Sequence, residues 1–165
     1  MNLGIKNKTA LVTGSSRGIG KSCAISLSKE GANVVICGRD KQTLTASLSE
    51  LKYINENTIG IVCDITDENG LSNVVSEIND TLGNIDILVN NVGGSVKKEG
   101  IEGTDISDMN KAFDLNLTPT IKLMQLVIPN MKSQKWGRII NISSVYGREL
   151  GGNISYMTAK AALNS

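Results

Sequence analysis

A phenol and an ammonium group stand four residues apart near the end of the sequence, at Tyr156 and Lys160. In a helix this spacing puts both side chains on one face. The positive charge of Lys160 favours the ionised form of a nearby phenol, since a unit charge about 4 Å away in an effective dielectric of about 20 contributes on the order of 4 kcal/mol. The spacing alone is common, but Ser143 and Ser144 precede the pair and follow an apolar run. The pair is therefore a candidate for acid–base chemistry.

Other groups that commonly do proton or metal chemistry are scarce. The sequence has no histidine, so the commonest metal ligand and the usual neutral-pH base are absent. Cys23, Cys37 and Cys63 form no CxxC pair, which favours small buried side chains in a reducing cytosol over a zinc site or a disulfide framework. Tyr146 is a decoy for the reactive phenol, because no lysine follows it four residues later.

A glycine-rich turn supplies the second candidate site. Gly14, Gly18 and Gly20 form G-x-x-x-G-x-G between an apolar run and a helix-spaced segment. Glycines let the backbone turn sharply and approach a pyrophosphate, and the N-terminus of the following helix presents free N–H groups. An ordinary strand-to-helix turn is the alternative interpretation. Because the pattern lies between the first apolar run and the first helix-spaced segment of a chain that alternates the two, it favours nucleotide binding.

Two arginines bear on which nucleotide is bound. The second apolar run, residues 33–37, leads into Gly38, Arg39 and Asp40. Arg39, together with Arg17 in the glycine turn, predicts a pair of guanidinium groups around a 2′-phosphate, and therefore NADP(H) rather than NAD(H). Two alternatives stay open: both arginines are solvated surface residues, or Asp40 reaches the ribose itself, as acidic residues do in NAD sites.

The elements that position these residues follow from periodicity. Short apolar runs alternate with segments of helical spacing, which is typical of repeated βα units. The pattern predicts an α/β fold, a Rossmann-like doubly wound parallel sheet whose ligands bind beyond the carboxyl ends of the strands. We expect residues 1–165 to form one NAD(P)-binding domain. The expected strands are 9–13, 33–37, 59–63, 85–89 and 138–142, and the expected helices are 19–31, one with Leu44, Leu48 and Leu51, one from Asp67 to Leu82, one opening near Ser107, one with Ile121, Met124, Ile128 and Met131, and 155–165.

Composition and charge limit the classes of partner. Lysine and arginine number 17 against 16 acidic residues, a formal charge of +1, so nothing in the charge favours nucleic acid or an anionic membrane. The N-terminus lacks the apolar run of a signal peptide, and no apolar stretch is long enough to span a bilayer. These features predict a cytoplasmic protein.

The motifs together resemble the short-chain dehydrogenase/reductase family. They occur in the family's order over essentially the whole chain, which makes the set far more specific than the glycine turn alone. The resemblance rests on Thr13–Gly20, Asp64, Asn90-Asn91-Val92-Gly93, Asn116, Asn141-Ile142-Ser143-Ser144, and Tyr156 with Lys160.

The resemblance implies hydride transfer between the cofactor and a small carbonyl or alcohol substrate. Tyr156 would be the general acid/base, Lys160 would favour its ionised form and hold the nicotinamide ribose, and Ser144 would hydrogen-bond the substrate oxygen. Asn116 would anchor a water that relays protons to Lys160, so no metal is needed. Asp64 would contact the adenine. The residues expected to bind the cofactor are Gly14, Ser16, Arg17, Gly18, Ile19, Gly20, Arg39, Asp64, Asn90, Gly93, Tyr156 and Lys160.

Several of these positions have a simpler interpretation. Asp64 could have the structural role of opening a helix and no more, and Asn90 with Asn91 could simply form a turn. Val92 stands where the family motif usually has alanine, a change that either crowds the cofactor or merely repacks its surroundings.

The family fold normally continues past the tyrosine helix. At roughly 30 residues per βα unit, about 60 to 80 residues of the fold are absent from this sequence, including the last strands and most of the substrate pocket. Three hypotheses follow: a truncated form of an active reductase, a non-catalytic nucleotide-binding remnant, or one half of a split enzyme that needs a partner chain. The family's homo-oligomer contacts would be compromised. Substrate identity stays open, and a 3-oxoacyl thioester is one candidate.

Overall fold

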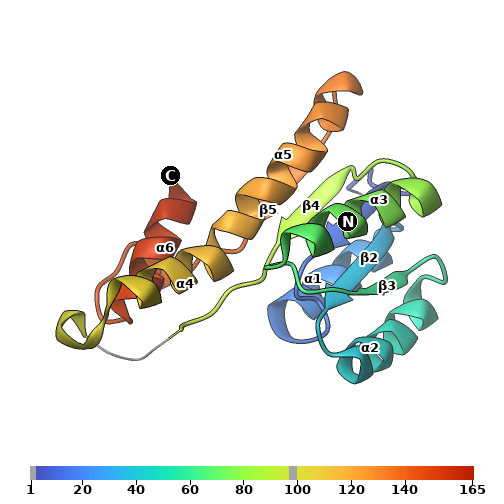
Figure 1. The fold of residues 1–165 in the computed structure, drawn as a ribbon. Helices are drawn as coiled ribbons and strands as arrows, with labels where there is room; N and C mark the ends of the chain where they lie inside the picture. The colour runs from blue at the N-terminus through green and yellow to red at the C-terminus, as the bar shows by residue number, and fades with distance from the viewer. Residues whose placement is uncertain (1–2, 97–99) are drawn as a thin grey trace.

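Five strands form one parallel sheet in the computed structural model of the chain, which describes residues 3–96 and 100–165. The strand order is β3-β2-β1-β4-β5, so the chain winds outward in one direction and then reverses beside β1 (Figure 1). This arrangement confirms the predicted doubly wound sheet. The strands are β1 Thr9–Val12, β2 Asn33–Gly38, β3 Ile59–Val62, β4 Ile87–Asn90 and β5 Arg138–Asn141.

Helices follow the strands as predicted, with small shifts at their ends. Asp40 caps α2 and Asp67 caps α3, each through a carboxylate that accepts a hydrogen bond from the first turn. Strand β4 starts at Ile87, two residues later than predicted, so Ile85 and Asp86 precede it. The helices are α1 Gly18–Lys29, α2 Lys41–Ile54, α3 Glu68–Leu82, α4 Ile106–Asn116, α5 Thr118–Ser133 and α6 Ile154–Asn164, with short 3₁₀ turns η1 Ile101–Gly103 and η2 Val145–Gly147.

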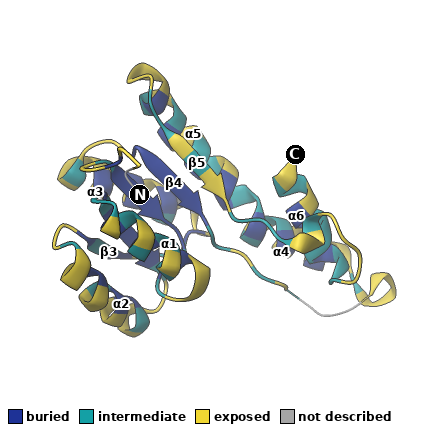
Figure 2. Cartoon of the chain, turned by 180° about the vertical axis from the view of Figure 1, so that it is seen from behind, coloured by how far each residue is buried: buried dark blue, intermediate teal, exposed yellow. Residues whose placement is uncertain are grey.

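Two apolar clusters cover the two faces of the sheet. On one face, Val12 and Ile36 pack with Ala24 of α1 and Leu51 of α2. On the other face, side chains of α3 and α5 pack against strand residues such as Leu11. Figure 2 shows the buried residues concentrated on the strands and on the inward sides of these helices. Alternate residues of the buried strands therefore serve opposite clusters, as the period of two requires.

The buried face of α5 differs from the expected one. Leu123 and Val127 are buried, whereas Ile121 of the predicted stripe is exposed. Met131 belongs to both stripes and is buried. The helix is apolar over a wide arc, so periodicity alone cannot choose between two stripes one residue apart; packing against α3 and the sheet decides it.

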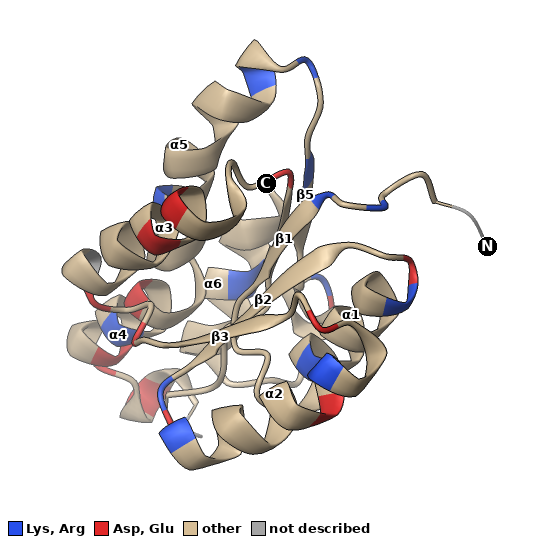
Figure 3. Cartoon of the chain, turned by 90° about the vertical axis from the view of Figure 1, so that its right-hand side faces the viewer, with Lys and Arg blue, Asp and Glu red and all other residues tan. Residues whose placement is uncertain are grey.

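The described part of the chain leaves β5 at the edge of the sheet. Ile140 on this strand is 42% exposed, while the central strands are almost fully buried. Helix α6 follows β5 and packs against α4, to one side of the sheet (Figure 1). None of the helices described in residues 3–96 and 100–165 is both long and apolar enough to span a membrane. Basic and acidic positions are interspersed in the view of Figure 3.

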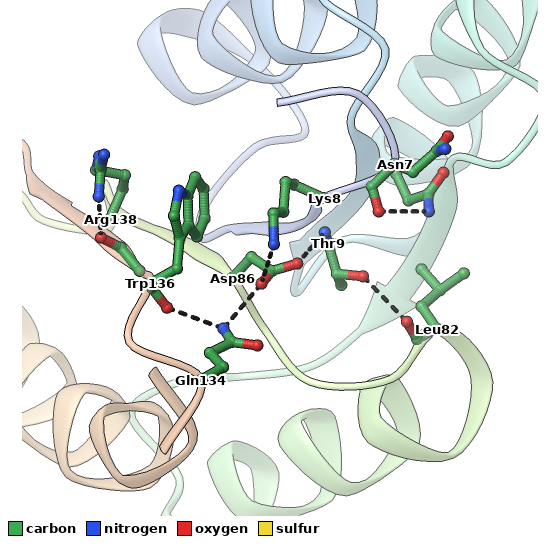
Figure 4. Close-up of polar contacts among 10 residues, drawn as sticks. Asn7, Lys8, Thr9, Leu82, Asp86, Gln134, Trp136 and Arg138 are labelled. Carbon is green, nitrogen blue, oxygen red and sulfur yellow. Dashed lines mark hydrogen bonds and ion pairs between the residues drawn. The ribbon is translucent and has the colours of Figure 1, made fainter. Parts of the chain in front are cut away.

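Asp86 joins three segments at the amino end of the sheet (Figure 4). Its carboxylate accepts hydrogen bonds from the backbone N–H of Thr9 at 3.0 Å, from Lys8 Nζ at 3.2 Å and from Gln134 Nε2 at 2.9 Å. Lys8 Nζ also lies 4.4 Å from the centre of the Trp136 ring, a cation–π contact. The carboxylate thus connects β1, β4 and the segment between α5 and β5, at the end of the sheet opposite the glycine turn.

We expect Asp86→Ala to lower the free energy of unfolding by about 3 kcal/mol, because it leaves a buried backbone donor and two further donors without their acceptor. Urea unfolding followed by far-UV circular dichroism measures this change. Asp80→Ala is the matched control, because Asp80 is exposed on α3. Equal losses in the two variants would show that the Asp86 contacts contribute nothing beyond an ordinary surface carboxylate.

Candidate active site

The glycine turn begins where β1 ends and closes at the first residue of α1. Gly14 and Gly18 have φ values of +59° and +58°, a region in which side chains cause strain. A Cβ atom on Gly14 would lie 2.8 Å from a methyl of Val92, whereas one on Gly18 would meet no atom within 4 Å. Arg17 precedes the helix without a side-chain cap. The turn therefore presents open backbone at a helix N-terminus, a favourable place for an anion.

Asn91 holds this turn in place. Its side-chain amide donates hydrogen bonds to the carbonyl oxygens of Thr13 and Gly14, at 3.0 and 3.1 Å. The Thr13 hydroxyl in turn accepts from the backbone N–H groups of Asn91 and Val92. A Cβ on Gly20 would lie 2.5 Å from the Asn91 amide nitrogen, so this glycine makes room for Asn91. Sequence reasoning named Asn91 within a motif but gave it no role; its position directly after β4 was the available signal.

A cleft of about 360 Å³ lies over the carboxyl ends of β1 to β4, and we call it the glycine-turn cleft. Six residues expected to bind a cofactor line it, and Val92, Thr43 and Leu115, which were not expected to do so, line it as well. Gly18 and Ile19, which were also expected to bind the cofactor, instead line a separate apolar groove beside α1. The six lining residues are Gly14, Ser16, Arg17, Arg39, Asp64 and Gly93.

The charged residues of this cleft pair with one another and with nearby threonines. Arg39 Nη1 lies 3.6 Å from Asp64 Oδ2, and the Arg39 side chain remains 72% exposed. Partial burial raises the pKa of Asp64, but hydrogen bonds from Thr66 and the charge of Arg39 outweigh it, so the pKa lies below its ordinary value.

Asp40 is occupied as a helix cap. One of its oxygens accepts from the Thr43 backbone N–H at 2.7 Å and also from the Thr43 hydroxyl. These two hydrogen bonds lower the pKa of Asp40, and the charge of Arg17 lowers it further. One oxygen of this carboxylate is thus engaged by α2, while Asp40 also lines the glycine-turn cleft.

Gly93, Asn116 and Lys160 converge at the inner end of the cleft. A Cβ on Gly93 would lie 2.7 Å from Asn116 Oδ1 and 3.0 Å from Lys160 Nζ. Asn116 is fully buried. Its side-chain oxygen accepts a hydrogen bond from the Gly94 backbone N–H at 2.9 Å, and its Nδ2 donates to the Gly94 carbonyl oxygen at 3.0 Å. It also donates to the Ala112 carbonyl at 2.8 Å. The amide thus fixes the Gly93–Gly94 segment, while its proposed contact with water stays a prediction.

Tyr156 and Lys160 lie on α6, one turn apart. Lys160 is 2% exposed, and its Nζ donates to the Ile142 carbonyl at 2.9 Å. Burial lowers the pKa of Lys160. Its Nζ lies 5.9 Å from the centre of the Tyr156 ring. Helix α6 therefore places a buried cation beside the phenol, as the spacing predicted.

Ser144 caps the short turn η2. Its hydroxyl oxygen accepts from the backbone N–H of Tyr146 at 3.2 Å, which leaves its own proton free to donate. Tyr146 and Tyr156 together line a second cavity of about 550 Å³, which we call the tyrosine cavity. Ser143 is joined to α6 through the Lys160 carbonyl, at 3.4 Å.

Asn90 lies in the sheet, outside the lining of both cavities. Its Nδ2 donates to Asn141 Oδ1 at 2.9 Å, which connects β4 to β5. Within the described residues its own oxygen is buried without a hydrogen-bond partner. These contacts give Asn90 a position behind the cleft, from which it supports Asn91 and the strand ends.

The two cavities adjoin at consecutive residues, because Gly93 lines the glycine-turn cleft and Gly94 lines the tyrosine cavity. Gly93 also lies next to the buried Lys160 Nζ, which is 5.9 Å from the centre of the Tyr156 ring, and Lys160 itself lines neither cavity. The Tyr156 phenol, which lines the tyrosine cavity, thus lies beside a buried cation, and the Ser144 hydroxyl is bound to the backbone of Tyr146, which lines the same cavity. This arrangement suits proton transfer to or from an oxygen atom.

Comparison with known proteins matches residues 8–165 to the family described as short chain dehydrogenase. A 3-oxoacyl-(acyl-carrier-protein) reductase of Aquifex aeolicus is 35% identical over 166 residues, covering 99% of this chain and 66% of that protein. The structure of L-sorbose reductase from Gluconobacter frateurii complexed with NADPH and L-sorbose has 30% identity and a TM-score of 0.93, over 99% of this chain and 62% of the other. A 7α-hydroxysteroid dehydrogenase complexed with NADH has 33% identity and a TM-score of 0.89, over 96% and 62%. The chain thus spans about two thirds of the length of these relatives.

Proposed function

Because this chain belongs to the short-chain dehydrogenase family, we propose that it transfers a hydride between NADP(H) and a small carbonyl or alcohol substrate. The observation that carries this proposal is the position of Gly93, which lines the glycine-turn cleft and lies next to Lys160 Nζ, itself 5.9 Å from the centre of the Tyr156 ring. The cleft side of Gly93 suits a dinucleotide, and the other side suits an oxygen that gains or loses a proton.

The residues present fit a dinucleotide. Open space at Gly18 and the bare helix N-terminus after Arg17 would receive the pyrophosphate, while Asp64 lines the outer part of the cleft. Lys160 would hold the nicotinamide ribose at the inner end. When bound, the cofactor supplies or accepts the hydride.

The chain's own groups would handle the proton. In the reductive direction, the Tyr156 hydroxyl donates its proton to the substrate oxygen, and the buried ammonium of Lys160 favours the negative charge left on the phenol. The Ser144 hydroxyl, whose oxygen is occupied by Tyr146 N–H, donates to the same substrate oxygen. Asn116 would hold a water toward Lys160, since both approach the same point beside Gly93.

The preference for NADP(H) is supported by the charges at the mouth of the cleft. Arg17 and Arg39 both line it, and the Asp40 carboxylate is engaged by Thr43. The Arg39 side chain is 72% exposed, so its ion pair with Asp64 is weakened by solvent and the guanidinium can exchange this partner for a phosphate. The two similar structures carry NADPH in one case and NADH in the other, so they favour neither cofactor.

We expect Arg39→Ala to raise the dissociation constant of NADPH about tenfold and to change that of NADH less than twofold, because only NADPH has a 2′-phosphate for the guanidinium. Fluorescence titration with each cofactor measures both constants. Lys52→Ala removes an equal charge from the exposed far end of α2 and should change neither. An equal loss of affinity for the two cofactors would reject the phosphate assignment.

The 3-oxoacyl-(acyl-carrier-protein) reductase among the relatives supports a 3-oxoacyl thioester as one substrate of the proposed class.

A specific observation also favours a second candidate function, in which this chain binds a nucleotide but turns over substrate only with a further polypeptide. An apolar groove of about 770 Å³ lies beside the exposed edge strand β5, lined by residues that include Ile19, Ile25 and Ile140. Turnover by the purified chain favours the first function, whereas NADPH binding with activity only after addition of a partner favours the second.

A further inference from the structure

Two of the three cysteines meet in the wall of the glycine-turn cleft. Cys37 is the next-to-last residue of β2, and Cys63 is the first residue past β3. These strands are parallel neighbours in which Cys37 pairs with Ile61, so Cys63, two residues beyond Ile61, points to the same face of the sheet as Cys37. Both cysteines line the cleft, and both pack in the apolar cluster that includes α3. All three cysteines of the chain are free thiols.

The two thiols interact, but their surroundings differ. Cys37 is fully buried, its backbone N–H bonds the Ser15 hydroxyl at 3.0 Å, and its sulfur lies 3.8 Å from the Val12 carbonyl oxygen. Cys63 is half-buried. The hydrogen bond between the two side chains lowers the pKa of Cys63, although burial and the charge of Asp64 oppose this. The same hydrogen bond, together with burial, raises the pKa of Cys37.

This difference gives the two sulfurs different roles in oxidation. A cysteine reacts with peroxide as the thiolate, so the more accessible and more acidic thiol, that of Cys63, is oxidised first. A second thiol held beside the oxidised sulfur can then complete a disulfide, and Cys37 is in that place. Cys23 is a useful contrast, because it lies on α1 and lines the separate apolar groove.

We propose that Cys63 and Cys37 form a peroxide-sensitive dithiol in the wall of the glycine-turn cleft. The Cys63 thiolate attacks one oxygen of hydrogen peroxide and breaks the O–O bond, which gives a sulfenic acid and a hydroxide that takes up the proton released by Cys63. The Cys37 sulfur then attacks the Cys63 sulfur, and the displaced hydroxyl group leaves with the Cys37 proton as water. Two thiols are thus oxidised to one disulfide, and one peroxide is reduced to two waters. An added thiol reverses the change by thiol–disulfide exchange.

The disulfide would alter the mouth of the cleft. It fixes the two Cβ atoms about 3.8 Å apart, which draws the start of the segment after β3 against the end of β2. Arg39 and Asp64 follow the two cysteines closely in the chain, and both line the cleft. We therefore expect the disulfide to weaken NADPH binding. This effect on binding rests on the proposed function, whereas the oxidation of the thiols does not.

Treatment of the purified chain with hydrogen peroxide tests this inference. Iodoacetamide blocks the remaining thiols, and mass spectrometry of an unreduced digest identifies linked peptides. Fluorescence titration measures NADPH affinity before oxidation, after it, and after addition of dithiothreitol. The variants are Cys37→Ala and Cys63→Ala, with Cys23→Ala as the matched control outside the glycine-turn cleft.

We expect the wild-type protein and Cys23→Ala to form the link between Cys37 and Cys63 and to lose NADPH affinity about tenfold, with both changes reversed by dithiothreitol. Cys63→Ala should form no link and keep its affinity after peroxide. Cys37→Ala should instead accumulate a sulfenic acid at Cys63, which dimedone traps, because the second thiol is missing.

Survival of both thiols under peroxide, or links formed through Cys23 or between molecules in place of the link from Cys37 to Cys63, would overturn the inference. A link that leaves NADPH affinity unchanged would overturn its effect on binding. A link between Cys37 and Cys63 in a chain that binds no NADPH even when reduced would sustain the dithiol and contradict the proposed function.

Discussion

Tyr156→Phe is expected to lower kcat for carbonyl reduction about 10³-fold, because it removes the proton donor and leaves the ring beside Lys160 in place. The dissociation constant of NADPH should change less than threefold, since the open backbone at the glycine turn is untouched. Stopped-flow measurement of NADPH oxidation with the bicyclic ketone trans-1-decalone gives the rate, and a titration gives the affinity.

Tyr53→Phe is the matched control for this experiment. It likewise removes a phenolic hydroxyl, but from a tyrosine that is 96% exposed near the end of α2 and distant from α6 in the sequence. Turnover of Tyr156→Phe at the wild-type rate would remove Tyr156 from the mechanism, whatever the cofactor affinity.

Gly18→Val is expected to weaken NADPH binding more than 100-fold. The added side chain would enter open space at the N-terminus of α1, where the pyrophosphate is proposed to bind, and its Cβ would meet no atom within 4 Å beyond its neighbours in sequence and the backbone of its own helix. Its φ of +58° also strains a β-branched residue, which we expect to cost about 1–2 kcal/mol of stability. Fluorescence titration and urea unfolding measure the two effects separately.

Gly83 provides an unusually close control for this substitution. It ends α3 with a φ of +78°, and a Cβ there also meets nothing within 4 Å. Because its ψ of −167° is also a region that essentially only glycine adopts, Gly83→Val should lose stability as well, and it should keep the full NADPH affinity. If the two variants lost affinity equally, the effect of Gly18→Val would be one of folding, and the glycine turn would not be the phosphate site.

Features set by local sequence could be predicted. The positive φ values of Gly14 and Gly18 follow from a glycine pattern between a strand and a helix, and the shared face of Tyr156 and Lys160 follows from their spacing in one helix. The order of strands and helices also follows from local periodicity, and the parallel sheet confirms it.

Features set by contacts between distant segments could not be predicted from the sequence. The Asn91 amide holds a turn 77 residues earlier in the chain, and nothing in its neighbours in sequence indicates that partner. Asp86 gathers donors from three segments, and the choice between two stripes on α5 depends on α3 and the sheet. Ile19 belongs to the glycine motif, yet it lines the groove beside α1, since a motif fixes the backbone but not the surface that a side chain faces.

In the proposed reaction, this chain transfers a hydride from NADPH to a carbonyl carbon with Tyr156 as the proton donor. The most direct measurement uses NADPH deuterated at both C4 positions, trans-1-decalone as acceptor, and mass spectrometry of the product. We expect an alcohol with one deuterium on the former carbonyl carbon, formed by the wild-type protein and about 10³-fold more slowly by Tyr156→Phe. Saturating NADPH binding with no deuterated alcohol from the wild-type protein would contradict this reaction.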